Sequence, residues 1–152
     1  MFYFSVGMFF WLILTAILLN RIIFHDQLAK KFVPTLFILI APPAVGMIAY
    51  VKITGSFDAF AQILYNLGIF FTFLLAFMYK NFIKLKFFIS WWAFTFPLAA
   101  VTISSMLAYK KTGYFLYSAL SYLFIAVTTI VIGIVVVKTI ENIKNKEICK
   151  PE

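Results

Sequence analysis

Apolar residues form five long blocks along the chain, and polar residues gather in the short stretches between them. A hydrocarbon core about 30 Å thick needs about 20 helical residues to cross it, and each block is about that long. An open strand would leave its backbone polar groups unpaired in lipid, so even the β-branched run VTTIVIGIVVV is predicted to be helical. The pattern predicts an all-α, polytopic membrane protein with five transmembrane helices, at about 2–19, 34–52, 58–79, 87–109 and 114–137.

Composition agrees with a membrane environment. Hydrophobic residues make up 64% of the chain and charged residues 12%, against about 45–50% and 25% in soluble domains. A net charge of +8 would suit a nucleic-acid partner, but the charged residues lie at the ends of the apolar blocks or in the tail. Lysines are expected at the ends of transmembrane helices. The expected partner is therefore the lipid bilayer, and no nucleic-acid binding is predicted.

The basic residues are distributed unevenly over the two sides of the predicted membrane domain, residues 1–140. Of the 13 basic residues, Lys52, Lys110 and Lys111 lie on one side and the other ten on the opposite side. The positive-inside rule makes the richer side cytoplasmic, so the tail 141–152 is expected inside the plasma (inner) membrane and Met1 outside. An outside N-terminus without a signal sequence, together with an odd number of helices, leads us to expect further helices upstream.

Beyond Pro34 at its first position, the second block carries the double proline Pro42 and Pro43 in APPAVG, and the fourth block carries Pro97 in SWWAFTFPLAA, whereas the third and fifth contain none. Proline removes a backbone N–H and clashes with the preceding turn. Because an unpaired polar group is costly in lipid, the broken turns should face protein or water, which makes these two helices the inner ones. A broken helix followed by an unbroken one occurs twice, which indicates a hairpin repeat. Ordinary kinks that are satisfied locally are the alternative.

Small residues lie beside the proline breaks. Gly46 follows Pro43, and Ala99 and Ala100 follow Pro97. They either leave a space that the ring of Phe96 fills or allow close helix packing, which is common in membranes, and both interpretations stay open. Thr95 and Thr102 are seven positions apart, so a nearly regular helix would place them on one face.

Two motifs resemble the TehA and plant slow anion channel family. One is SWWAFTFPLAA with the Thr/Ser-rich segment after it, and the other is PTLFILIAPPAVGMIAY with the later ILYNLGIFF. This family is also described as voltage-dependent anion channels or C4-dicarboxylate/malate transporters. The resemblance implies a ten-helix subunit of five hairpins with proline-kinked inner helices around a pore, commonly assembled as a trimer. The chain is similar to helices six to ten. The family's phenylalanine gate would be Phe96, or less favourably Phe94, and the expected pore-lining or kink residues are Pro42, Pro43, Gly46, Thr95, Pro97, Ala99, Ala100 and Thr102.

The resemblance implies transport of small anions, either by a channel or by a C4-dicarboxylate or tellurite-resistance-type permease. The chain would be a truncated or partial family member, and a partner could supply the missing helices. The resemblance leaves the anion open. An ion-coupled organic-acid carrier is an alternative, although coupling usually needs a titratable group in the translocation path and this half is expected to supply none there. Gln62 and Asn66 form the only strongly polar membrane pair. An assembly fragment without transport is a further alternative. No enzyme, cofactor or metal site is expected, since His25 stands alone in a loop.

Overall fold

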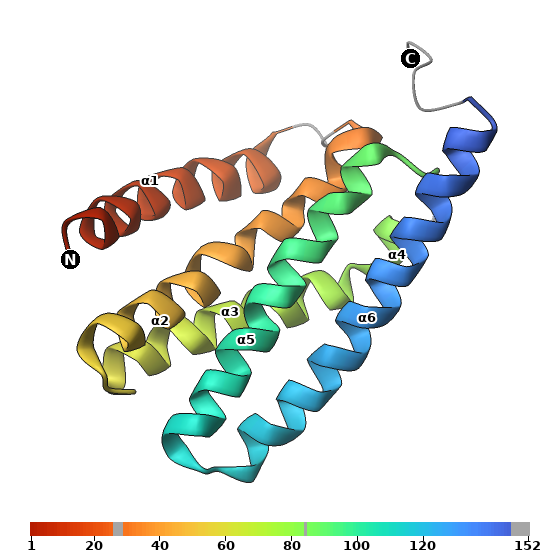
Figure 1. Ribbon diagram of the computed structural model, residues 1–152. Helices are drawn as coiled ribbons and strands as arrows, with labels where there is room; N and C mark the ends of the chain where they lie inside the picture. The colour runs from red at the N-terminus through yellow and green to blue at the C-terminus, as the bar shows by residue number, and fades with distance from the viewer. Residues whose placement is uncertain (26–28, 84, 147–152) are drawn as a thin grey trace.

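The computed structural model describes residues 1–25, 29–83 and 85–146 (Figure 1). Five helical spans are long and apolar enough to cross a membrane, and no strand occurs in these ranges, so the predicted all-α, five-span fold is confirmed. The elements in chain order are α1 (Phe2–Phe24), η1 (Lys30–Leu39), α2 (Ala41–Thr54), α3 (Ala59–Phe77), α4 (Tyr79–Ile83), η2 (Ile89–Phe94), α5 (Thr95–Thr112) and α6 (Phe115–Lys144). The η elements are 3-10 helices.

Each proline-containing span consists of a 3-10 helix followed by an α-helix. Pro42 and Pro43 are the second and third residues of α2, and Pro97 is the third residue of α5. The first backbone N–H groups of an α-helix have no partner within that helix, so a proline there sacrifices no hydrogen bond. The prolines therefore mark the starts of two α-helices inside the membrane spans, at the positions where the sequence pattern predicted breaks.

The two broken spans pack against each other along their length, η1 on η2 and α2 on α5. At the 3-10 end, the Ser90 hydroxyl donates to the carbonyl of Lys31 over 2.6 Å. Figure 1 shows α1, α2, α5 and α6 following one another across the molecule, with α3 behind α2 and α5. A broken span followed by an unbroken helix thus occurs twice, as the hairpin repeat predicts.

Helix α3 is held against α2 and α5 by close approach and by one buried hydrogen bond. A Cβ placed on Gly68 would lie 3.6 Å from the backbone nitrogen of Ala44, so the two helices approach closely here. Nearer the other end, the Tyr65 hydroxyl lies 3.1 Å from the Ser105 Oγ. Because Ser105 itself donates to the carbonyl of Val101, Tyr65 is the donor. These contacts fix which sides of α2 and α5 face α3.

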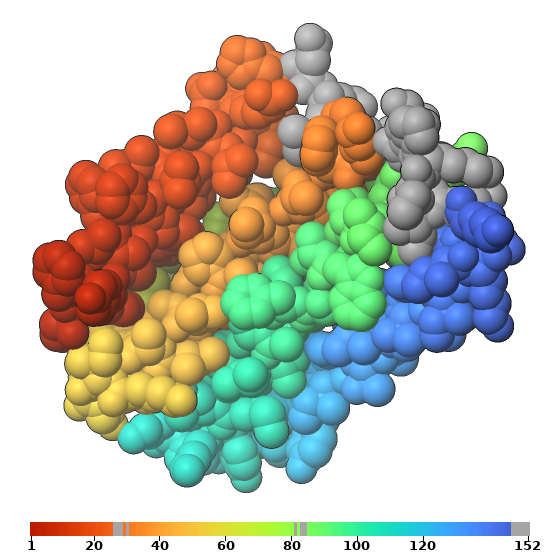
Figure 2. All heavy atoms as spheres, turned by 45° about the horizontal axis from the view of Figure 1, so that its top comes forward, coloured from red at the N-terminus to blue at the C-terminus, as the bar shows by residue number. Residues whose placement is uncertain are grey.

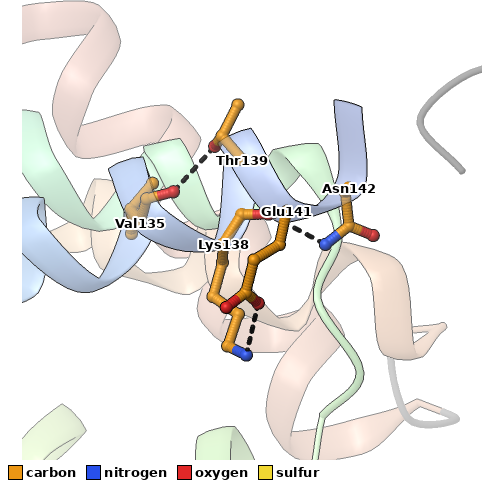
Figure 3. Close-up of polar contacts among 5 residues, drawn as sticks. All are labelled: Val135, Lys138, Thr139, Glu141 and Asn142. Atoms are coloured by element: carbon orange, nitrogen blue, oxygen red, sulfur yellow. Dashed lines mark hydrogen bonds and ion pairs between the residues drawn. The ribbon is translucent and has the colours of Figure 1, made fainter. Parts of the chain in front are cut away.

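The first and last helices extend beyond their apolar blocks, since α1 ends at Phe24 and α6 at Lys144. In the last turns of α6, Lys138 pairs with Glu141 over 2.8 Å and the Asn142 amide donates to the carbonyl of Lys138 (Figure 3). Hydropathy measures only the part of a helix that lies in hydrocarbon, and polar residues continue the helix into the aqueous layer. Residues 147–152 of the expected tail lie outside the described part.

At the opposite end of the bundle, Asp58 caps α3. Its Oδ1 accepts from two backbone N–H groups of the first turn at 3.1 and 3.2 Å, and its Oδ2 accepts from the Tyr50 hydroxyl at 2.7 Å. The Tyr50 hydrogen bond, followed by the backbone donors, holds the pKa of Asp58 below its usual value. The Lys111 ammonium donates to the carbonyl of Gly55 over 2.7 Å, which ties the end of α5 to the α2–α3 loop.

Candidate pore-lining face

Helices α2 and α5 lie side by side between α1 and α6 (Figure 2) and expose one continuous face. Ala44 on α2 and Ser105 on α5 face α3, and the exposed positions lie on other sides of the same helices. Phe96 is 63% exposed, Ile103 52% and Val45 40%. Positions three, four and seven residues apart share a helix side, so each helix contributes one stripe. We call these stripes the α2–α5 face, which comprises Pro42, Val45, Ala49 and Lys52 on α2 and Phe96, Ala99, Ile103, Met106 and Lys110 on α5.

The α2–α5 face is uncharged along the membrane and ends in two exposed lysines. Lys52 lies seven residues after Val45, and Lys110 seven residues after Ile103, so both continue the exposed stripes at the C-terminal ends of their helices. Sequence reasoning used these lysines only to assign topology. The seven-residue spacing that runs from Phe96 to Lys110 was the signal that could have placed Lys110 on this face.

The two gate candidates lie in opposite environments. Phe94 is only 7% exposed and packs against other rings, with centroid distances of 4.7 Å to Phe37, 5.8 Å to Phe82 and 5.8 Å to Trp91. Phe96, two positions later, projects from the α2–α5 face. Of the two, Phe96 is therefore the one placed to meet a solute on that face, and its gate role stays a prediction.

The hydroxyl groups expected near a permeating anion are engaged in helix hydrogen bonds. Thr95, half-buried, donates to the carbonyl of Trp92 over 2.8 Å. Thr102 is buried and donates to the carbonyl of Leu98 over 2.7 Å, while its Oγ1 lies 3.2 Å from that of Thr128 on α6. Both threonines lie in α5, seven positions apart, so they share a helix side as the spacing predicted, and at Thr102 this side faces α6. Neither hydroxyl hydrogen is directed at the α2–α5 face.

The other predicted site residues divide between the helix packing and the face. Pro43, Pro97 and Ala100 are buried, whereas Pro42, Gly46 and Ala99 are half-buried. Gly46 faces α1, since a Cβ placed on it would lie 3.5 Å from the Met8 sulfur. Pro42 and Ala99 belong to the stripes of the α2–α5 face. The pore-lining role of this set stays a prediction.

Five membrane-crossing spans, of which two pack together and are each broken at a proline, define a class: multi-pass helical membrane proteins built from hairpins. The model of the voltage-dependent anion channel family matches residues 1–140, and the chain belongs to this family. The family resemblance of the proline-containing motifs is thereby confirmed.

Three relatives illustrate the range of the family. The S-type anion channel SLAH3 of Arabidopsis thaliana is 32% identical over 139 residues, which cover 91% of this chain and 22% of the relative. An uncharacterized transporter of Methanocaldococcus jannaschii is 31% identical over 131 residues, which cover 78% of this chain and 37% of the relative. The tellurite resistance protein TehA homolog of Haemophilus influenzae is 30% identical over 139 residues, which cover 91% of this chain and 41% of the relative. The chain therefore spans less than half the length of each of these relatives.

Proposed function

We propose that the α2–α5 face lines one side of a membrane pathway for small anions. The observation that supports this most directly is the pairing of two proline-started helices whose shared exposed face has no charged residue before Lys52 and Lys110. Membership in an anion channel family supports anions as the solute. Since the chain spans less than half of its relatives, further helices, from a longer form of the protein or from a partner subunit, complete the pathway.

The charges on this face suit an anion that passes without being trapped. Lys52 and Lys110 attract anions within a screening length of about 8 Å at physiological salt, at the end that the topology prediction places outside. Beyond them the face is uncharged, so an anion is held weakly and can leave again, as conduction requires.

The uneven distribution of lysines supports the remaining features of the proposal. Nearly all of the basic residues outside Lys52, Lys110 and Lys111 lie toward the end of the bundle where α1 and α6 finish, which is the cytoplasmic side in this proposal. This distribution supports a multi-pass topology with a cytoplasmic C-terminus, here in the plasma membrane, and membership in an anion channel family supports a role without an enzymatic reaction. Assembly as a trimer is carried over from the family resemblance.

The experiment compares the 152-residue chain alone with the same chain joined behind the N-terminal part of the Haemophilus relative, which supplies the helices missing from the pathway. In liposomes, the chain alone should give no anion flux above background, and the completed protein should give flux. In the completed protein, Phe96→Ala should raise the flux because it removes a ring from the pathway. Phe70→Ala is the matched control, since Phe70 is 56% exposed but lies on α3. Unchanged or lower flux in a well-folded Phe96→Ala protein would contradict the gate.

Pro97→Ala should act in the opposite direction. Alanine supplies the missing N–H and allows α5 to extend backwards into η2, which would straighten the span and lower the flux. Opposite effects from two neighbouring residues are difficult to explain by packing alone. If both substitutions change the flux in the same direction, the break at the start of α5 does not have the proposed role.

A coupled carrier is distinguished by a proton gradient. Coupling usually requires a titratable group in the pathway, and the described part of the α2–α5 face has none apart from the lysines at its end. Gln62 and Asn66 are exposed on α3 and do not belong to this face. Flux through the completed protein should therefore be the same with and without a proton gradient, and a gradient-dependent flux would favour the carrier.

A further inference from the structure

An apolar groove of about 380 Å³ lies between α3 and α6, over the start of α5. Both α3 and α6 pack on α5, but they do not pack extensively on each other, which leaves the groove between them. Phe73 and Ala76 form the α3 wall, and Leu123 and Val127 form the α6 wall. The floor contains Phe94 and Leu98. We call this feature the α3–α6 groove.

The lining of the α3–α6 groove suits a hydrocarbon chain. Among the described residues no charged side chain lines it, and the threonine in its wall, Thr72, donates its hydroxyl to the carbonyl of Gly68 over 2.7 Å. Its volume falls within the range of about 300–1,000 Å³ that ligand sites occupy. Apolar cavities do not hold water stably and accept apolar ligands instead. Phe73, Leu123 and Val127 are exposed at the rim, so the groove opens toward the surrounding bilayer.

One end of the groove is basic. Tyr79 lines this end, the exposed Lys80 follows it directly, and Lys86 is exposed in the next loop. Between Asp58 and Glu141 the sequence contains no acidic residue. Tyrosine is enriched where the hydrocarbon meets the headgroups. Glu141, in the last turns of α6 at this end of the bundle, is paired with Lys138 over 2.8 Å. A negatively charged headgroup here would therefore meet Lys80 and Lys86 rather than an unpaired described carboxylate.

We propose that the α3–α6 groove binds one acyl chain of an anionic phospholipid from the leaflet on the side of Lys80 and Lys86. The chain packs on Phe94 and Leu98, and the phosphate lies by the two lysines. Phe94 lies two residues before Phe96 and faces the opposite way, so the bound lipid supports the start of α5 from behind the α2–α5 face. This site does not depend on the proposed anion pathway.

The test uses the full chain in nanodiscs that contain phosphatidylglycerol with a diazirine in the middle of one acyl chain. After illumination, mass spectrometry should find the lipid adducts concentrated on the groove walls, at positions such as Ala76 and Val127. Ala76→Trp fills the groove and should reduce these adducts to the level of the other helices. The matched control is Ala126→Trp, which places the same side chain at an exposed α6 position outside the groove lining.

The headgroup is tested by replacing phosphatidylglycerol with phosphatidylcholine that carries the same labelled chain. One lysine near an anionic lipid surface corresponds to a preference of about fivefold, and Lys80→Gln with Lys86→Gln should remove the preference. Adducts that are spread evenly over all lipid-facing helices, or that persist in Ala76→Trp, would overturn the site. Groove walls that carry no lipid adducts while the other lipid-facing helices are labelled would show that the groove is covered and would overturn the site, and equal labelling by both lipids would overturn the anionic headgroup.

Discussion

Phe94 and Phe96 are two positions apart, yet the structure predicts very different costs for truncating them. Phe94 is 7% exposed and contacts three aromatic rings with centroids within 5.8 Å. Phe96 is 63% exposed and has no ring partner among the described residues. The two substitutions to alanine remove the same atoms from the same helix junction, so the difference between them reports packing alone.

The magnitude follows from the cavity that each substitution leaves. Burial in a membrane gives little gain from water exclusion, because lipid is as apolar as the protein interior. The cavity contribution remains, and removing about 100 Å³ at about 24 cal/mol per Å³ gives at most about 2.4 kcal/mol for Phe94→Ala. Phe94 also lies in the floor of the α3–α6 groove, so an acyl or detergent chain can fill part of the space. Lost ring contacts contribute further, at about 0.5–1.5 kcal/mol for each aromatic pair. Phe96→Ala leaves no enclosed cavity and should cost less than about 1 kcal/mol.

The assay is reversible unfolding of the purified chain in mixed micelles by increasing SDS, followed by tryptophan fluorescence, since Trp91 packs against Phe94. Phe94→Ala should shift the unfolding midpoint to lower SDS, and Phe96→Ala should leave it almost unchanged. Equal shifts for the two variants would refute the assignment of Phe94 to the packing and of Phe96 to the exposed face.

The remaining predictions concern the contacts that hold the bundle. Gly68→Leu should separate α2 from α3 and destabilise the chain by about 1–3 kcal/mol in the same SDS assay, whereas Gly133→Leu should be neutral because nothing lies within 4 Å of its Cβ position. Tyr65→Phe and Ser105→Ala should show a coupling of about 0.6 kcal/mol in a double-mutant cycle, and zero coupling would mean that the hydrogen bond is absent. The pKa of Asp58 is lower in the folded protein than in the unfolded chain, where it is about 3.9. The carboxylate therefore contributes to stability at a pH above the unfolded-state pKa, and this contribution is lost as the pH falls through the folded-state pKa. The thermal midpoint should therefore fall more steeply below about pH 4 in the wild type than in Asp58→Asn, and identical pH profiles would contradict the role of this carboxylate.

The positions of the five spans could be predicted from the sequence because the lipid requirement for about 20 apolar helical residues leaves few alternatives. Helix ends were less predictable, since hydropathy does not report where a helix stops in water, and α6 extends to Lys144. Proline spacing predicted the two breaks. It did not predict the 3-10 helices before Ala41 and Thr95, because proline is equally compatible with a kink and with the first turn of a new helix.

The candidate site was partly predictable for a similar reason. The motif placed two phenylalanines beside Pro97, but their directions depend on where the α-helical turn begins, at Thr95. The partner of Thr102 is Thr128, 26 residues away on another helix, and no spacing rule within one segment can show such a contact. Helical periodicity could have shown that Lys110 continues the stripe of Phe96.

The central claim, that the α2–α5 face lines a water-filled anion pathway, is tested most directly by thiol accessibility. In the completed protein with Cys149 replaced by serine, Ile103→Cys should react with a membrane-impermeant, negatively charged methanethiosulfonate, because the reagent needs a thiolate in contact with water. The bound sulfonate should then reduce the anion flux. Ala126→Cys, exposed on α6, should remain unmodified in lipid. Reaction and block at Ile103→Cys alone is the predicted result, and an unreactive Ile103→Cys in a conducting protein would contradict the account.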